Sequence, residues 1–246
     1  MINIKLTVQY VGTNYKGFQR QKMKKTIQDQ IENALFKIFE IEIGITGCGR
    51  TDSGVHALMH VSNFKLEKDL KIPIFTLRHA INAHLPEDIL CTDCAIVHED
   101  FHSRYSAKER EYMYVIYNSE KMPPFYLKRA WNVYQKLNTR KLKKTLKFIK
   151  GEHDFTNFCA NLKENENRIR KITGVKVKQK GEKVFIYIKG YAFLHKMIRM
   201  IVGTAVDISL KNEKPSKMKE FLNPDFLKKG YRIAPPYGLY LYRIKY

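Results

Sequence analysis

Apolar and polar residues alternate over residues 2–10, and this period of two is typical of a strand with one buried face. Thr26 then stands where a helix N-cap is expected, with Asp29 three residues later. Apolar residues follow at helical spacing from Ile27 to Ile38. The rest of the first half predicts strands over residues 41–46, 56–65 and 88–97, and a second helix that Pro73 opens.

The second half of the chain repeats this order of elements. Residues 111–118 are rich in Tyr and Val and predict a strand. Leu142, Leu146 and Ile149 mark a helix whose C-terminus Gly151 is placed to cap. The later segments predict a hairpin of residues 172–179 and 183–190 closed near Lys180 and Gly181, an apolar helix over residues 194–210, and a final strand over residues 238–246.

Both halves therefore follow the order β-α-β-β-α-β of the ferredoxin-like split βαβ motif. The halves are alike in the pattern of their elements and not in their residues. We expect an α+β fold in which two ferredoxin-like (RRM-like) units share a central antiparallel sheet with helices packed on it. The expected division is an N-terminal subdomain of residues 1–104 and a C-terminal subdomain of residues 105–246. Sheets of this kind with exposed aromatic side chains are a known way of binding RNA.

The composition is that of a folded protein. Hydrophobic residues make up 44% of the 246 residues and aromatic residues 12%, which excludes a disordered basic tail. No run of 18 apolar residues is present, so no membrane-spanning helix is expected. The first residues alternate instead of forming a charged and then apolar leader, so we expect no signal peptide and a cytoplasmic location.

The charge balance indicates a polyanionic partner. Lys and Arg number 45 against 24 Asp and Glu, a formal net charge of +21. The surplus is spread along the whole chain, which favours a broad electropositive face on a folded body that binds a structured nucleic acid. The alternative is a lysine-rich surface that is merely solvated.

The four cysteines do not form a recognisable metal motif. Cys91 and Cys94 have the spacing of half a zinc site, but no second pair at comparable spacing supplies the remaining ligands. We therefore expect both to be strand residues, and we expect neither a metal nor a cofactor.

Residues 47–56 carry the most informative chemistry. Three glycines within eight residues interrupt the strand pattern and allow tight turns. Between them lie Arg50 and Asp52, and a carboxylate beside a cation stays ionised and can attack a sugar carbon as a nucleophile. The alternative is an Asx turn, in which Asp hydrogen-bonds its own backbone, and the spacing alone favours that alternative.

The segment GCGRTDSGVHA, residues 47–57, resembles the signature G-x-GRTDxGVHA of the TruA-type tRNA pseudouridine synthases. YVGTNYKGFQRQ, residues 10–21, resembles the N-terminal block of that family. The departures are Ser53, Cys48 and Phe18, and none removes a functional group that the chemistry needs. Further blocks occur in the family's order: NAHLPEDI, DFHSRYSAKEREYMY, GEHDFTNF, HKMIRMIVG and APPYGLYL. The resemblance thus covers nearly the whole chain.

The resemblance implies a role for four residues. Asp52 would be the nucleophile, and Tyr112 would stack on the target base and help to move the proton from C5. Arg199 would pair with the catalytic Asp, and Arg50 would help to displace the target base from its stack. Without the resemblance, Tyr112 would be read as an ordinary strand residue and Arg199 as a solvated one.

The implied reaction converts uridine to pseudouridine at positions 38, 39 and 40 of the tRNA anticodon stem-loop. It needs no metal and no cofactor, and the target base must leave its stack. The resemblance also implies a homodimer in which a bound tRNA contacts both subunits. The N-terminal subdomain would carry the catalytic Asp loop, and the C-terminal subdomain would complete the active site.

Two other functions remain as alternatives. A non-catalytic RNA-binding protein built on two RRM-like units would share the charge and the fold, although no clear RNP1-type block appears in either half. A metal-dependent hydrolase could use His56 and His60, but these lie in a predicted strand and lack the Glu of a zincin motif.

Overall fold

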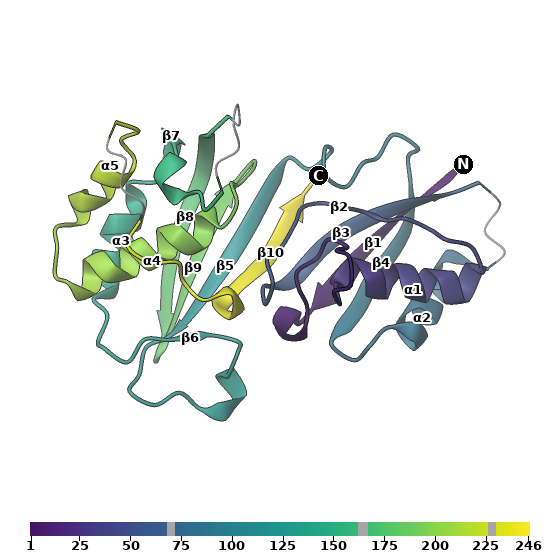
Figure 1. Ribbon diagram of the computed structural model, residues 1–246, viewed down its shortest axis with the longest axis horizontal. Helices are drawn as coiled ribbons and strands as arrows, with labels where there is room; N and C mark the ends of the chain where they lie inside the picture. Colours follow the sequence, from purple (N-terminus) through teal and green to yellow (C-terminus); the bar gives the residue numbers. More distant parts are fainter. Residues whose placement is uncertain (68–71, 162–166, 226–229) are drawn as a thin grey trace. The chain divides into compact units, whose positions relative to one another are not determined.

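The computed structural model describes residues 1–67, 72–161, 167–225 and 230–246 of the chain. It divides into two compact units (Figure 1). Unit 1 comprises Met1–Lys108 with Tyr240–Tyr246, and unit 2 comprises Glu109–Leu239. The division falls a few residues after the expected boundary at residue 104, and the last strand clusters with unit 1 instead of the second half of the chain.

Unit 1 is built on a mostly antiparallel sheet in the order β4-β1-β3-β10. Its central strand β1 pairs antiparallel with both β3 and β4, while β10 runs parallel to β3. The strands are β1 (Ile2–Tyr10), β2 (Thr46–Gly47), β3 (His56–Leu66), β4 (Ile89–Val97) and β10 (Leu239–Lys245), and the helices are α1 (Ile27–Phe39) and α2 (Ile74–His84). The expected β-α-β-β-α-β order is therefore present in unit 1.

The core of unit 1 follows the two periods read from the sequence. Along β1 the side chains of Ile4, Leu6 and Val8 are buried, every second residue as a pleated strand requires. On α1 the buried residues Ile27 and Ile31 lie one turn apart and form its apolar stripe.

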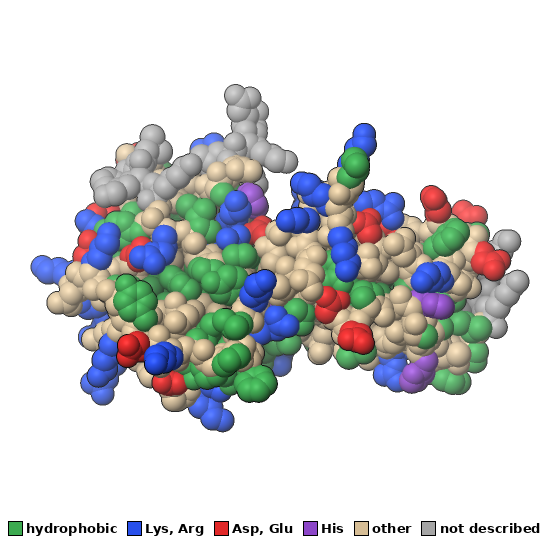
Figure 2. Space-filling model, turned by 60° about the horizontal axis from the view of Figure 1, so that its bottom comes forward, with side chains coloured by type: hydrophobic (Ala, Val, Ile, Leu, Met, Phe, Trp, Pro, Cys, Tyr) green, Lys and Arg blue, Asp and Glu red, His purple; other side chains and the backbone are tan. Residues whose placement is uncertain are grey.

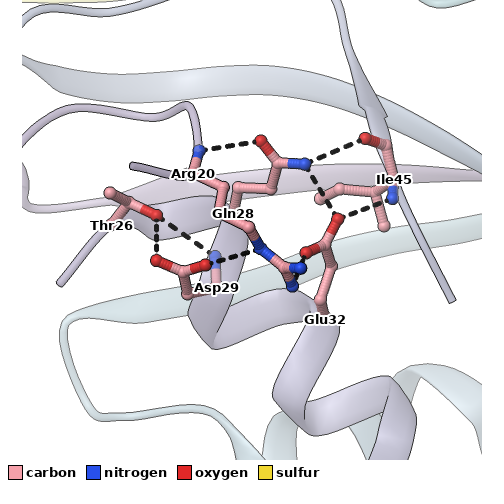
Figure 3. Close-up of polar contacts among 6 residues, drawn as sticks. All are labelled: Arg20, Thr26, Gln28, Asp29, Glu32 and Ile45. Atoms are coloured by element: carbon pink, nitrogen blue, oxygen red, sulfur yellow. Dashed lines mark hydrogen bonds and ion pairs between the residues drawn. The ribbon is translucent and has the colours of Figure 1, made fainter. Parts of the chain in front are cut away.

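The beginning of α1 is capped as the sequence predicts. The Thr26 hydroxyl accepts a hydrogen bond of 3.3 Å from the Asp29 backbone N–H and donates one of 2.5 Å to the Asp29 carboxylate (Figure 3). This reciprocal pair satisfies one of the free N–H groups of the first helical turn. The helix α2 likewise begins directly after Pro73.

The strand expected over residues 41–46 is wrong, because only Thr46–Gly47 forms a strand there. Glu40 ends α1 in the left-handed conformation with φ 57°. The backbone N–H of Ile45 then donates to the Glu32 side chain at 2.9 Å, where a strand residue would pair with a neighbouring strand. Ile43 and Ile45 are buried, which accounts for the alternating apolar pattern, but they are buried as loop residues and not as strand residues.

Unit 2 has an antiparallel sheet in the order β5-β9-β8-β7, with β6 paired parallel to β5. The predicted hairpin is confirmed, since β8 and β9 are joined at Gly181, whose φ of +57° suits a glycine. Its strands are β5 (Glu109–Tyr117), β6 (Trp131–Asn132), β7 (Gly151–Asp154), β8 (Ile169–Lys180) and β9 (Lys183–Gly190), and its helices are α3 (Thr139–Lys147), α4 (Met197–Leu210) and α5 (Met218–Phe221).

Two helix ends in unit 2 differ from the sequence pattern. Gly151 does not cap α3, because the Phe148 N–H closes the last turn on the Thr145 carbonyl and Gly151 instead begins β7 with φ +113°. The apolar helix begins at Met197, since Lys196 precedes it in the left-handed conformation.

Short 3₁₀ helices occupy Gly12–Asn14, Pro124–Tyr126, Thr156–Phe158, Pro215–Lys217 and Pro236–Gly238.

Helix α4 supplies much of the core of unit 2. Twelve of its residues are buried, and only Arg199 and Leu210 are not. Among the helices of the described residues, none is both long and apolar enough to cross a lipid bilayer.

We predict that Thr26→Ala lowers the free energy of unfolding by about 1 kcal/mol, because the helix loses its N-cap acceptor. Urea denaturation measures the change. Asn33→Ala, at an exposed position inside α1, serves as the control and should shift stability by no more than about 0.5 kcal/mol. Equal stability of the Thr26 variant and the wild type would contradict the capping role.

Candidate active site

Residues 47–56 form a loop that leaves β2 and returns as β3 in unit 1. The Cys48 N–H donates to the Val61 carbonyl at 2.8 Å, and the Val55 N–H donates to the Asp52 carbonyl at 3.1 Å. The Thr51 hydroxyl shares a hydrogen bond of 2.8 Å with the buried Tyr10 hydroxyl. Cys48, Thr51 and Val55 are buried, so the loop is fixed on both sides of Asp52.

The segment that follows β1 holds the same loop from its other side. Phe18 donates its backbone N–H to the Thr51 carbonyl at 3.2 Å. The Tyr15 carbonyl accepts from the Gly54 N–H at 3.3 Å and from the Ser53 hydroxyl at 3.1 Å. Two of the blocks that resemble the family, residues 10–21 and 47–57, are therefore hydrogen-bonded to each other.

Two glycines allow this approach of backbone to backbone. A Cβ atom on Gly12 would stand 1.8 Å from the Val55 carbonyl oxygen. A Cβ atom on Gly17, whose φ is +98°, would stand 2.6 Å from the Thr51 carbonyl oxygen. No side chain fits at either position, so this segment can contact the loop only because both residues are glycines.

A neutral histidine supports the beginning of the loop. The His60 ring stacks on Phe18 with ring centroids 3.9 Å apart, and its Nε2 lies 3.1 Å from the Gly49 carbonyl oxygen. Burial lowers the pKa of His60 to about 4, so the ring is uncharged at neutral pH and donates from Nε2 to this carbonyl. The tight packing continues at Gly47, where a Cβ atom would meet the Phe18 ring at 2.4 Å.

A buried carboxylate ties these segments to α1 (Figure 3). Glu32 accepts hydrogen bonds from the Ile45 N–H at 2.9 Å and from the Gln28 amide at 2.8 Å, and it forms an ion pair with Arg20. Arg20 also donates to Asp29 at 2.8 Å. The network joins the end of the N-terminal segment, the first turns of α1 and the chain that leads into the loop.

The candidate residues Arg50 and Asp52 stand on this one loop. Arg50 is exposed and Asp52 is half-buried, while their neighbours Cys48 and Thr51 point into the core. The loop thus presents a cation and a carboxylate from a rigid backbone, an arrangement suited to nucleophilic chemistry on a bound substrate.

Tyr112 and Arg199, the other two candidates, belong to unit 2. Tyr112 is half-buried on β5 opposite Ile188 of β9, and its ring meets Phe193 edge-on at 5.1 Å. Arg199 lies in the first turn of α4, and its Nε donates to the Ala234 carbonyl at 2.8 Å. The Ala234 N–H donates back to the Arg199 carbonyl at 3.0 Å.

The histidine and cysteine positions do not resemble a metal site. The Nδ1 atom of His56 accepts a hydrogen bond of 3.0 Å from the Gly12 N–H, and the Nε2 atom of His60 is hydrogen-bonded to the Gly49 carbonyl. Cys91 and Cys94 lie in β4 as expected, and burial raises the pKa of each thiol to about 12, which disfavours the thiolate that zinc binds. No group of three or more His, Cys, Asp or Glu residues converges anywhere in the described ranges.

The sequence pattern did not reveal the supports of the loop. Glu32 follows Ile31 directly in the predicted helix, and only the structure shows that it is buried and paired. The stack of Phe18 on His60 has no local signal, because the two residues are distant in sequence.

The chain is similar to known enzymes along its whole length. A family model described as tRNA pseudouridine synthase matches residues 6–106 and 147–246. A tRNA pseudouridine synthase A of Brachyspira hyodysenteriae is 38% identical over 99% of this chain and 98% of its own. A tRNA pseudouridine synthase A 2 of Clostridium perfringens is 37% identical, and a tRNA pseudouridine synthase A of Caldicellulosiruptor saccharolyticus is 38% identical, both over 100% of each chain.

Among solved structures, a chain of a Cbf5-Nop10-Gar1 complex aligns with 82% of this chain and 53% of its own. The TM-score of this alignment is 0.35 and the sequence identity is 13%.

The family model and the relatives identify this α+β protein as an isomerase that acts on RNA. The chain belongs to the tRNA pseudouridine synthase family, and it makes pseudouridine in tRNA. This membership excludes the two alternatives, the non-catalytic RNA-binding protein and the metal-dependent hydrolase, as the main function.

We predict that Gly12→Ala destabilises the protein by roughly 1–3 kcal/mol, because the new methyl group overlaps the Val55 carbonyl. Pseudouridine formation should fall about a hundredfold, since a loop displaced by about 1 Å misplaces its reacting group. Gly44→Ala is the matched control, because a Cβ atom there meets nothing within 4 Å. Thermal unfolding and activity should be unchanged in the control, and a Gly12 variant that behaves like it would refute the close-packing argument.

The buried His60 should make stability depend on pH. Its pKa falls from 6.5 to about 4 on folding, so the unfolded chain binds the proton more tightly. The neutral His60 therefore contributes to the free energy of unfolding fully above pH 6.5, and this contribution is lost as the pH falls toward 4. The loss amounts to about 2 kcal/mol between pH 8 and pH 5. Urea unfolding across this range should show a shallower pH dependence for His60→Gln than for the wild type. Substitution of the exposed His79 by Gln is the control, and equal slopes in all three proteins would contradict the assignment.

Proposed function

We propose that this enzyme isomerises uridine to pseudouridine at positions 38, 39 and 40 of the tRNA anticodon stem-loop, with Asp52 as the nucleophile. The observation that carries the proposal is the loop itself. Asp52 is half-buried, and the residues before and after it are held by the Tyr10, Tyr15 and Phe18 contacts, so the loop fixes the backbone from which the carboxylate projects.

The proposed step is an exchange of bonds at one sugar carbon. The Asp52 carboxylate attacks C1′ of the target uridine, and the bond from C1′ to N1 of the uracil breaks. The uracil turns within the site, a bond forms between its C5 and C1′, and the carboxylate leaves. The proton on C5 is then transferred to a base and N1 takes up a proton, so the product is an isomer of the substrate and no oxidant or reductant is consumed.

Three other residues have proposed roles. Tyr112 stacks on the target uracil and helps to transfer the C5 proton. Arg199 pairs with the catalytic carboxylate, and its place in α4 supports this role, because it is the one residue of the first three turns of that helix that is not buried. Arg50 helps to displace the target base, consistent with its exposed position beside Asp52.

The net charge of +21 supports binding of a structured polyanion such as the anticodon arm. We propose that the enzyme works in the cytoplasm as a homodimer in which each tRNA touches both subunits. The reaction as proposed uses side chains alone, with neither a metal nor a cofactor.

We predict that Asp52→Asn abolishes pseudouridine formation and leaves the Kd for tRNA within about tenfold of the wild type. The physical reason is that affinity comes from many phosphate contacts and catalysis from one carboxylate. Mapping pseudouridine at positions 38, 39 and 40 of tRNA transcripts measures the reaction, and filter binding measures the affinity. Asp100→Asn, at an exposed site in unit 1, is the control and should react normally.

Measurable turnover by purified Asp52→Asn protein would refute the nucleophile assignment. Modification by the wild type only at other tRNA positions would leave Asp52 in place and refute the anticodon stem-loop as the target.

A further inference from the structure

Helix α3 of unit 2 carries an unbroken basic face. Residues 139–150, which contain this helix and the turn after it, hold six Lys or Arg and no Asp or Glu. The helix packs inward through the buried Leu142 and Leu146, which leaves its charges on the outside. The exposed basic residues are Arg140, Lys143, Lys144, Lys147 and Lys150.

This arrangement destabilises the isolated protein. Lys143 and Lys147 are four residues apart, and Lys144 and Lys147 are three apart, so like charges face each other on one helix surface. None of the five exposed residues forms an ion pair with any residue in the described part of unit 2. The helix therefore presents a charge surplus that an external anion would relieve.

The C-terminal end of α3 opens into a groove of about 610 Å³, which we call the α3–α5 groove. Its lining includes three lysines and a histidine together with the apolar side chains of Phe148 and Leu222. The Lys219 ammonium lies 5.2 Å from the centroid of the Phe148 ring, in a cation–π contact. The lining residues are Lys147, Phe148, Lys150, His153, Lys219, Leu222, Asn223 and Pro224.

Two carboxylates near the groove are engaged elsewhere, while Glu152 and Asp225 are exposed and do not line it. Glu220 pairs with Lys217 at 2.9 Å, although it is adjacent to Lys219 in sequence. Asp154 accepts the Thr156 N–H at 2.7 Å and does not line the groove. Lys and Arg side chains are also frequent over the left part of Figure 2, where unit 2 lies.

We propose that the α3–α5 groove and the basic face of α3 bind the sugar–phosphate backbone of the substrate tRNA. This inference rests on tRNA being the substrate, and it adds a binding surface that contains none of Arg50, Asp52, Tyr112 or Arg199. Lysine is a mobile point charge suited to phosphates, and the row of exposed lysines matches a chain of phosphates better than a single anion. The apolar side chains of Phe148 and Leu222 offer a contact for a ribose or for the face of a nucleobase.

The test removes three charges of the groove and keeps the side-chain stems. The variant Lys147→Gln/Lys150→Gln/Lys219→Gln is compared with Lys37→Gln/Lys65→Gln/Lys136→Gln, which removes the same charge from exposed positions outside the groove. Filter binding to full-length tRNA over a salt series gives the Kd and the slope of log K against log salt. Steady-state kinetics separates KM from kcat, and circular dichroism confirms that each variant is folded.

We expect the groove variant to bind tRNA at least about tenfold more weakly at moderate salt, with a slope shallower by about 2 to 3, because each lost phosphate contact removes nearly one unit. The fall in kcat/KM should arise from KM. The control variant should stay within about twofold of the wild type. The single substitution Lys150→Gln should give a smaller loss in the same direction.

Equal affinities and slopes for the groove variant and the control would overturn the proposal and leave the groove lysines as solvated charges. A loss in kcat at unchanged Kd would also overturn it. Both results are independent of the Asp52 test, because failure of the nucleophile assignment changes turnover and not the binding slope of these lysines.

Discussion

The structure of the candidate active site depends on contact between two stretches of backbone with no side chain between them. Gly12 and Gly17 bring the segment after β1 against the carbonyls of Val55 and Thr51, closer than any Cβ atom permits. From this approach follow the hydrogen bonds of Tyr15 and Phe18 to the loop, and with them the fixed position of the backbone at Asp52. A catalytic group held within about 0.5 Å needs such support, because its own side chain cannot supply it.

The second requirement is a compensated buried charge. Glu32 is 5% exposed, and a carboxylate at such a site destabilises the fold unless it is paired and hydrogen-bonded. Arg20, the Gln28 amide and the Ile45 N–H together meet that requirement. The same contacts replace the strand that the apolar pattern of residues 41–46 predicted, and they direct the chain toward the loop. One buried side chain thus serves the helix, the N-terminal segment and the approach to Asp52.

The two units hold their candidate residues by different means. In unit 1, Arg50 and Asp52 stand on a loop between strands, and neighbouring segments restrain its backbone. In unit 2, Tyr112 stands on β5 beside β9, and Arg199 stands on a helix that is otherwise almost entirely buried. The two hydrogen bonds between Arg199 and Ala234 link α4 to the segment before the last strand. The basic face of α3 contains none of these four residues, so the charges proposed to bind tRNA are distinct from the few groups proposed for the chemistry.

The sequence by itself determined the order of the longer elements, though not β6, β7 or α5. It also determined the capped start of α1, the β8–β9 hairpin and the family, because periodicity, caps and a contiguous motif are local. The roles of Asp52, Arg50, Tyr112 and Arg199 came from the resemblance and stay predictions. Only the tertiary structure decided that residues 41–45 form a loop, that the last strand pairs with β3, and that Phe18, His60 and Glu32 support the motif. These features depend on contacts between residues that are distant in the chain. The spacing of apolar residues indicates which side chains are buried, but it does not indicate which residues they pack against.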